Sequence, residues 1–204
     1  FTPNSMCQVR FKAGNIDFSN HKFDFDVVFV GSNNSGRLFN PINKHWWGSQ
    51  ERKKLVNALY AKFGMRFGLF GIGWDLPCSQ GPVLFNEQQS AFRRGRIVVG
   101  GNPYSYSDYY SSNRLFFEVA SGIPTVELSV PRLNTILKNN EHCYFVDNID
   151  GVIDKCEMLL KEKPQDLYVK AAKAANYIEE NHTQYHRIKF KLNTVKRSID
   201  NKNK

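Results

Sequence analysis

The chain has 204 residues, of which 41% are hydrophobic, enough to bury one good core or at most two small ones. No apolar run approaches the ~20 residues that span a bilayer, which excludes a transmembrane helix. The formal net charge is +9, and the four scattered cysteines show neither a C-x-x-C pair nor a metal-like spacing with histidine. We therefore expect a cytoplasmic protein with reduced thiols and no metal site.

The positive charge is concentrated in two segments. Residues 37–66 and residues 187–204 each hold seven lysines and arginines against one acid, so each contributes +6 and the remainder sums to −3. A localised excess of this kind suits a polyanionic partner, such as a diphosphate, a nucleic acid or an acidic membrane surface. The alternative is a solvated helix face with a soluble tail, and for the C-terminal segment both interpretations stay open.

The first half of the chain alternates between strand and helix patterns. Residues 1–25 are typical of loop, and we expect them to be a linker or the remnant of a preceding domain. The apolar run 25–30 ends in Gly31 and Ser32, which predicts a buried parallel strand leaving into a loop. After it we expect a helix at 50–63, a strand at 65–70, a helix at 86–94 and a strand at 96–99.

The second half continues the alternation and ends in helices. We expect strands at 125–128 and 143–146, a small helix at 133–137, and helices at 152–161, 165–180 and 183–199. Such alternation predicts a doubly wound, Rossmann-like parallel sheet over residues 26–182, followed by a basic helix and tail over 183–204. In this fold class ligands bind beyond the C-terminal ends of the strands, here at loops 31–49, 71–85 and 101–113.

The most informative stretch is a polar, aromatic-rich loop that runs into a short helix before Gly122 and Pro124. Asn113 is its predicted N-cap, and the free N–H groups and positive dipole of a helix start suit a phosphate. Glu118 lies one turn further along, where an ionised carboxylate could hold two ribose hydroxyls. The stretch therefore predicts a nucleotide site, although Arg114 could instead form an ordinary i,i+4 ion pair with Glu118.

Four motifs in order give this chain a family resemblance: DVVFVGS, FGIGW, NRLFFEVASGIP and ENHTQYHR. Together they resemble the C-terminal half of a GT-B glycosyltransferase, nearest to the spore-maturation-protein branch with a "glycosyl transferases group 1" domain. The resemblance covers about residues 26–187. It implies a hexosyltransferase-like enzyme whose donor is a nucleotide-sugar of the UDP or GDP type, with no other cofactor. The acceptor-binding N-terminal domain of that family is absent, so the resemblance implies a half-enzyme that is inactive alone.

The resemblance also assigns roles to individual residues. Glu118 would bind the donor ribose, and Gly31 with Ser32 would form the loop nearest the sugar. The diphosphate would lie at Asn113, Arg114 and the backbone N–H groups of Leu115 and Phe116. Arg52 or Lys53 could supply a second phosphate cation, the alternative being an exposed basic helix start. Val83, in the segment 81–83, lies where related enzymes touch the base through backbone atoms.

One departure from the family pattern affects catalysis. Many relatives carry a second acid seven residues before the ribose glutamate, and Ser111 stands at that position here. The catalytic residues and the choice between a retaining and an inverting reaction therefore stay open. Two other functions follow as alternatives: a non-catalytic nucleotide-sugar-binding module, and a nucleic-acid-engaging domain that could glycosylate DNA. His182 and His186, four residues apart with no third ligand in view, favour orientation of the last helix over metal binding.

Overall fold

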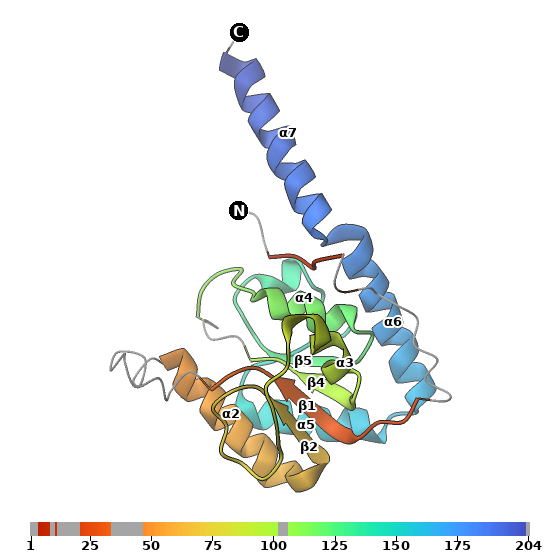
Figure 1. Cartoon of the computed structure of the whole chain (residues 1–204). Coiled ribbons are helices and arrows are strands. Elements are labelled where there is room, and N and C mark those ends of the chain that lie inside the picture. The colour runs from red at the N-terminus through yellow and green to blue at the C-terminus, as the bar shows by residue number, and fades with distance from the viewer. Residues whose placement is uncertain (1–3, 9–10, 12–20, 34–46, 102–105, 203–204) are drawn as a thin grey trace.

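The computed structural model describes residues 4–8, 11, 21–33, 47–101 and 106–202. Within them, one parallel sheet has the strand order β3-β2-β1-β4-β5-β6 (Figure 1). The strands are β1 (Phe25–Val30), β2 (Phe67–Phe70), β3 (Ser79–Gly81), β4 (Gly95–Val99), β5 (Thr125–Leu128) and β6 (Tyr144–Val146). The chain winds outward in both directions from β1 and β4, so the predicted doubly wound sheet is confirmed, with its switch point between these two strands.

Helices cover both faces of this sheet. One face carries α2 (Trp47–Phe63) and α5 (Ile149–Lys161), whereas the other carries α3 (Gln88–Phe92), α4 (Asn113–Ala120) and α6 (Pro164–Asn181) (Figure 1). The last helix, α7 (Gln184–Lys202), extends away from the body of the domain. The predicted C-terminal helices are therefore present, but only the first two of them cover the sheet.

The central strand β1 shows why the sheet holds two helical layers. Val27 and Phe29 pack into the core with Leu55 and Leu59 of α2, while Val28 packs into the other core. Successive side chains of a strand point to opposite faces, so a continuous apolar run supplies both layers at once. Burial on two faces also explains why β1 reads as an unbroken hydrophobic segment in the sequence.

The edges of the fold depart from the sequence prediction. Strand β3 was not predicted, because Ser79–Gly81 is a short polar edge strand that pairs only with β2 and carries no apolar pattern. The helix expected at 133–137 is a single 3₁₀ turn, Leu133–Thr135. The helix expected at 86–94 is divided into a 3₁₀ turn, Phe85–Glu87, and the short α3. In all three places local hydrogen bonding and edge pairing decide the conformation.

Residues near the start of the chain join the root of α7. The backbone N–H of Met6 donates to the His182 carbonyl at 2.8 Å, and that of Gln184 donates to the Met6 carbonyl at 2.9 Å. His182 ends α6, and the His186 ring contacts the Thr183 hydroxyl at 2.7 Å. Both histidines therefore hold the α6–α7 junction, as the sequence suggested. The predicted domain boundaries at 25 and 182 stay predictions, since most of residues 1–20 lies outside the described part.

The structure bears on two predictions made from the sequence: that the chain lacks a transmembrane helix, and that residues 37–66 form a basic segment. In the described part of the chain, no helix combines the length and apolarity that a bilayer crossing requires. Arg37 and Lys44, which contribute to the first basic segment, lie outside the described residues. The remaining bases of that segment lie on α2 and in the turn that follows it.

Candidate functional site

Gly31 and Gly100, which directly follow β1 and β4, lie beneath a cluster of polar side chains at the switch point. Gly31 donates to the Phe70 carbonyl at 2.7 Å, and its own carbonyl accepts the indole N–H of Trp74 at 2.6 Å. Gly100 donates to the Val126 carbonyl at 2.9 Å, which ties the end of β4 to β5. Neither residue has a side chain, so neighbouring charged groups can approach the backbone closely.

Arg114 is the side chain that spans this switch point. From the first turn of α4 its Nε donates to Oε1 of Glu118 at 2.8 Å, and its Nη2 donates to the Gly101 carbonyl at 2.8 Å. The guanidinium also lies over the Phe29 ring, 5.3 Å from the centroid, and fills the space where a Gly31 side chain would be. The ion pair weighed at the sequence level is therefore present, but it is largely buried rather than exposed.

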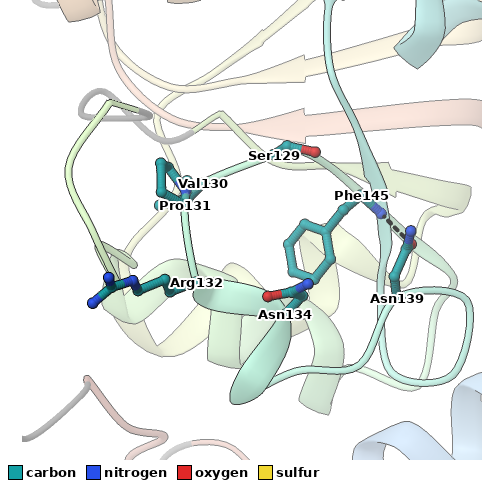
Figure 2. Close-up of a pocket in the computed structure, with 7 residues that line it drawn as sticks. All are labelled: Ser129, Val130, Pro131, Arg132, Asn134, Asn139 and Phe145. Carbon is teal, nitrogen blue, oxygen red and sulfur yellow. Dashed lines mark hydrogen bonds between the residues drawn. The ribbon is translucent and has the colours of Figure 1, made fainter.

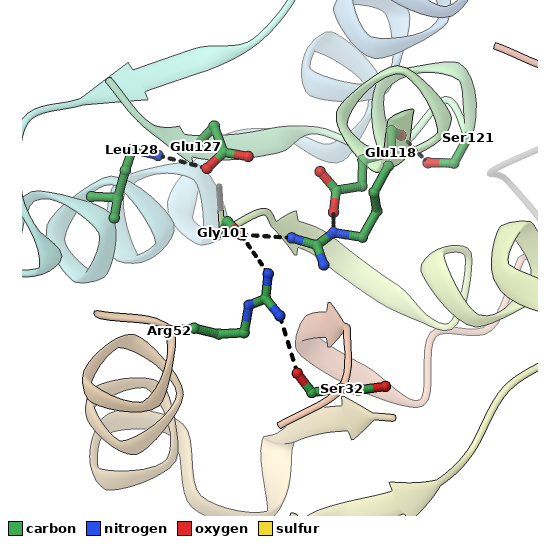
Figure 3. Close-up of polar contacts among 8 residues, drawn as sticks. Ser32, Arg52, Gly101, Glu118, Ser121, Glu127 and Leu128 are labelled. Atoms are coloured by element: carbon green, nitrogen blue, oxygen red, sulfur yellow. Dashed lines mark hydrogen bonds and ion pairs between the residues drawn. The ribbon is translucent and has the colours of Figure 1, made fainter. Parts of the chain in front are cut away.

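Arg52 approaches the same carbonyl from the opposite layer. Its Nη1 donates to the Ser32 carbonyl at 3.1 Å, and its Nη2 to the Gly101 carbonyl at 3.4 Å (Figure 3). Burial, and then the nearby charge of Arg114, lower the pKa of Arg52 to about 10. Two guanidinium groups from different helices thus converge on one backbone oxygen, which concentrates positive charge at the C-terminal edge of the sheet.

Glu118 is fully buried, and only half of its carboxylate is used. Oε1 accepts from Arg114, whereas Oε2 has no hydrogen-bond partner among the described residues. Burial raises the pKa of the Glu118 carboxyl, and the charges of Arg114 and Arg52 oppose this rise. A buried carboxylate oxygen without a partner is costly, so the site favours a hydroxyl or N–H donor at this position.

Glu127 is a second buried acid that sequence reasoning missed. It lies near the end of β5, is 1% exposed, and its Oε1 accepts the backbone N–H of Leu128 at 3.1 Å (Figure 3). A Cβ on Gly100 would lie 2.1 Å from Oε2 of Glu127 and 2.7 Å from Oε2 of Glu118, so the two oxygens are less than about 5 Å apart. The available signal was an acid inside an otherwise apolar run of a strand buried on both faces.

The start of α4 differs from the prediction in detail. Ser112, not Asn113, is the N-cap, with φ −73° and ψ 156°, and Asn113 is the first helical residue and is exposed. The N–H of Leu115 donates to the Ser112 carbonyl at 3.3 Å, and the side chains of Leu115 and Phe116 are buried in the core. Ser111 is 3% exposed, and its hydroxyl has no hydrogen-bond partner among the described residues.

The predicted site residues fall into two groups. The structure brings Gly31, Ser32, Arg52, Arg114 and Glu118 together through the contacts described above. Arg52 lies in the second turn of α2, which begins at Trp47, so it does not open the helix as expected. Lys53 is exposed, and Val83 packs partly buried against the core layer that contains Phe117. The diphosphate and base roles of these last two residues stay predictions.

A hollow of about 420 Å³ opens beyond β5, in the size range of ligand pockets (Figure 2). Its lining includes Ser129, Arg132, Asn134 and Asn139, and the Phe145 ring forms part of its wall. The Asn139 side chain accepts the Phe145 backbone N–H at 2.9 Å. Among the described residues, no group of three or more His, Cys, Asp or Glu is placed to hold a metal ion.

The sequence profile of the family described as "Glycosyl transferase-like" matches residues 50–193, more than two thirds of the chain. This chain belongs to that glycosyl transferase-like family. The matched region contains Arg52, Arg114, Glu118 and Glu127, so every charged member of the cluster lies within the family domain. The spore-maturation branch inferred from the motifs stays a prediction. No curated protein sequence matches the chain significantly.

Solved structures of low sequence identity share the fold of this glycosyl transferase-like domain. Sucrose-phosphate synthase from Thermosynechococcus elongatus matches with a TM-score of 0.65 and 11% identity, covering 97% of this chain and 52% of that one. S. aureus TarM, in a complex containing UDP, matches with a TM-score of 0.58 and 15% identity, covering 89% of this chain and 37% of that one. A mutant of T4 phage BGT in complex with UDP-glucose matches with a TM-score of 0.55 and 16% identity, covering 83% of this chain and 48% of that one. The chain therefore spans between 37% and 52% of the length of these proteins.

Proposed function

We propose that the chain is the donor-binding half of a GT-B glycosyltransferase, which holds a nucleotide-sugar for transfer of the sugar to an acceptor. The domain belongs to a glycosyl transferase-like family, and two structures that share its fold are complexes with UDP or UDP-glucose. These names support a donor of the nucleoside-diphosphate type. Because the chain spans only 37% and 48% of the length of those two proteins, an acceptor-binding domain elsewhere in the polypeptide would complete the enzyme.

The observation that carries this proposal is the buried, half-satisfied carboxylate of Glu118. Its Oε2 faces the bare backbone of Gly100, at the strand ends where ligands of this fold class bind. Two ribose hydroxyls are suitable donors, because a carboxylate can accept a hydrogen bond at each oxygen. On this proposal the ion pair between Arg114 and Oε1 of Glu118 is the arrangement without ligand, and a ribose hydroxyl would donate to Oε2 when the donor binds.

The two arginines would serve the leaving group. Transfer of the sugar leaves a nucleoside diphosphate, on which negative charge develops as the glycosidic bond breaks. Arg52 and Arg114 already converge on the Gly101 carbonyl, so a diphosphate bound beside them would meet preorganised charge-assisted donors. This role requires no metal ion or further cofactor, and the sugar would lie toward Gly31 and Ser32.

The proposal is tested by calorimetry with UDP, GDP, CDP and dTDP. Glu118→Gln keeps the size of the side chain but removes its charge, so it should weaken the best ligand by about 1–3 kcal/mol. Glu180→Gln, on the exposed end of α6, is the matched control and should bind like the wild type. A folded Glu118→Gln protein with unchanged affinity would remove the ribose assignment.

One observation favours a second candidate, a non-catalytic nucleotide-sugar-binding module. Ser111 occupies the position of the family's second acid, and its buried hydroxyl cannot act as a carboxylate would. The full-length polypeptide distinguishes the two candidates: donor binding with neither transfer nor donor hydrolysis indicates the module, whereas either reaction indicates the enzyme. A cytoplasmic location is part of the proposal, and the four free cysteines support it.

A further inference from the structure

Four charged side chains from α2, α4 and β5 meet at the end of β4, and Glu127 is the one without a role in the proposed donor site (Figure 3). A Cβ on Gly100 would lie 2.1 Å from Oε2 of Glu127 and 2.7 Å from Oε2 of Glu118. Arg114 and Arg52 lie beside the two acids. Burial lowers the pKa of Arg52, and the charge of Glu127 opposes this fall more strongly than the charge of Glu118 does. Glu127 therefore belongs electrostatically to the same cluster.

Both glutamates are buried within this domain alone. Glu118 is 0% exposed and Glu127 is 1% exposed. A further domain of the polypeptide could cover this region more deeply, but it would not expose either acid. A buried carboxylate keeps its charge only where opposite charge or hydrogen-bond donors compensate for the water that it has lost. The charge of these two acids therefore depends on the two arginines and on any ligand beside them.

The net charge of the cluster is too low for a diphosphate. Arg52 and Arg114 are protonated at neutral pH, Arg52 with a pKa of about 10, and they balance two ionised glutamates. Each phosphate of a nucleotide-sugar carries one negative charge, so a bound diphosphate adds two negative charges to a neutral, buried cluster. Neutralising one of the carboxylates would leave one net positive charge for the ligand.

The contacts of the two acids show which of them would be neutralised. Oε1 of Glu118 accepts from Arg114 at 2.8 Å, and ribose hydroxyls would donate to its ionised form. Oε1 of Glu127 accepts the uncharged backbone N–H of Leu128 at 3.1 Å, a bond that the carbonyl oxygen of a protonated carboxyl can also make. Arg52, whose charge favours ionised Glu127, is the guanidinium that a diphosphate would engage. Ligand binding thus withdraws support from the Glu127 carboxylate.

We propose that Glu127 is a further residue of the donor site, which takes up a proton from solution when a nucleotide-sugar binds. The proton converts the Glu127 carboxylate into a neutral carboxyl group, and the cluster then holds the diphosphate with one net positive charge. Two carboxylates in one buried site favour such a proton, because like charges raise the pKa of one member of the pair. This inference rests on the proposed function, since it requires a diphosphate beside Arg52 and Arg114.

Two further titratable groups face the cluster. Cys143 precedes β6, and burial, followed by the charges of Glu127 and Glu118, holds the pKa of its thiol well above the ordinary value of 9.0. Tyr110 precedes α4, and its charge is among those that act on Arg52. A thiol of this kind and an ordinary phenol already hold their protons at neutral pH. Neither can take up another, so proton uptake in the cluster belongs to the two glutamates.

Isothermal titration calorimetry of the 204-residue protein measures this proton. The probes are UDP-, GDP-, CDP- and dTDP-glucose, whose diphosphates neither gain nor lose a proton between pH 7 and pH 8.5. This interval lies above the ordinary histidine pKa of 6.5 and below the Arg52 pKa of about 10. Titrating the tightest probe in buffers of different ionisation enthalpy should give an uptake of about one third of a proton to one proton per ligand. Affinity should fall at least about threefold from pH 7 to pH 8.5.

Glu127→Gln separates the charge of this residue from its place in the fold. Glutamine has a similar size and stays neutral at every pH, so the variant should take up no proton and bind equally at pH 7 and pH 8.5. At pH 8.5 it should bind at least about threefold more tightly than the wild type, a gain that loss of a structural residue would not produce. Glu180→Gln, on the exposed end of α6, is the matched control and should keep the wild-type uptake.

The outcomes separate this inference from the proposed function. A nucleotide-sugar that binds without proton uptake, or with the same uptake in Glu127→Gln, would overturn the inference and leave donor binding in place. Uptake that persists in Glu127→Gln but disappears in Glu118→Gln would place the proton on the other acid and overturn it equally. Binding of none of the four probes would remove both proposals. If circular dichroism shows that Glu127→Gln does not fold, the wild-type uptake still decides, because it needs no variant.

Discussion

Glu118 on α4 and Glu127 on β5 turn a carboxylate oxygen toward the same backbone carbon, that of Gly100. Glu127 is 1% exposed and Glu118 is fully buried, so two acids share one buried site with Arg52 and Arg114 nearby. Acids held this close require opposite charge or a shared proton. Because a side chain at position 100 would occupy the space of both carboxylate oxygens, only glycine allows the two glutamates to lie this close.

Replacing Gly100 by alanine should disrupt the cluster. The new Cβ would fall 2.1 Å from Glu127 Oε2 and 2.7 Å from Glu118 Oε2, and neither side chain is free to move into solvent. We expect Gly100→Ala to lower the free energy of unfolding by about 2–3 kcal/mol, measured by urea denaturation.

A double-mutant cycle attributes that loss to the carboxylate contact. Glu127→Ala removes the nearer obstacle, so Gly100→Ala should cost much less in the Glu127→Ala background, a coupling of about 1–2 kcal/mol. Additive effects would show that the alanine acts through Glu118 or the backbone and not through Glu127.

Arg114→Ala should destabilise the domain by about 3 kcal/mol near pH 8, because it leaves Glu118 buried without its ion-pair partner. Burial already raises the pKa of Glu118, and loss of Arg114 raises it further. A carboxyl whose folded pKa lies above its unfolded pKa stabilises the fold most when protonated, and this contribution is lost as pH rises through the folded pKa. The destabilisation should therefore be smaller at pH 5 than at pH 8, measured by urea denaturation at both.

Glu118→Gln supplies the control for that pH dependence. In Arg114→Ala/Glu118→Gln the titrating group is gone, so the difference between pH 5 and pH 8 should fall to that of the Glu118→Gln single variant. If the double variant keeps the pH dependence of Arg114→Ala, a group other than Glu118 is responsible.

The sequence predicted the elements whose apolar residues follow the pattern of burial in the folded protein. Strand β5 was placed at its observed bounds, Thr125–Leu128, and β1 was recognised from its apolar run. Strand β3 could not be found, because a polar edge strand of three residues is stabilised by pairing with β2 and not by its own composition. The same holds for the start of α4, where the choice between Ser112 and Asn113 depends on backbone angles.

Contacts of the site were predictable from the sequence when both residues belong to one helix, and not when they belong to different elements of the fold. The Arg114–Glu118 spacing is visible within a single helix, and the structure shows the pair. The approach of Arg52 to Gly101 joins residues 49 positions apart through the packing of α2, so no local pattern signals it. For Glu127 the only local signal was an acid inside an apolar run, whereas the strand order shows that β5 is an interior strand of the sheet.

Acid should weaken the α6–α7 junction through His182. Burial, and then the charge of Arg187, lower the pKa of His182 to about 4, from an ordinary value of 6.5. A histidine with a depressed folded pKa contributes stability above pH 6.5 that is lost as pH falls toward 4, because the unfolded chain binds the proton first. We expect a loss of about 1–2 kcal/mol over this window, measured by thermal unfolding.

His182→Asn tests that origin. The oxygen of the introduced amide can accept from Arg187, as Nδ1 of the histidine does at 2.5 Å, but the amide does not titrate. The stability of this variant should change less than that of the wild type between pH 6.5 and pH 4. The remaining slope should come in part from His142, whose pKa burial also lowers. Identical curves for the two proteins would place the acid sensitivity elsewhere.

Phe11 should be as important to stability as a residue of the central core. Its ring stacks on Phe117 of α4, with centroids 4.1 Å apart and planes 5° from parallel, and it is 0% exposed. Truncation of a buried phenylalanine leaves a cavity, so Phe11→Ala should cost about 3–5 kcal/mol in urea denaturation. The exposed Phe190 is the control, and Phe190→Ala should change stability by less than about 0.5 kcal/mol. A Phe11→Ala effect as small as the control's would support the sequence prediction that residues 1–25 are a linker. The expected large effect would instead make this segment part of the folding unit, because the ring fills space beside the helix that carries Glu118.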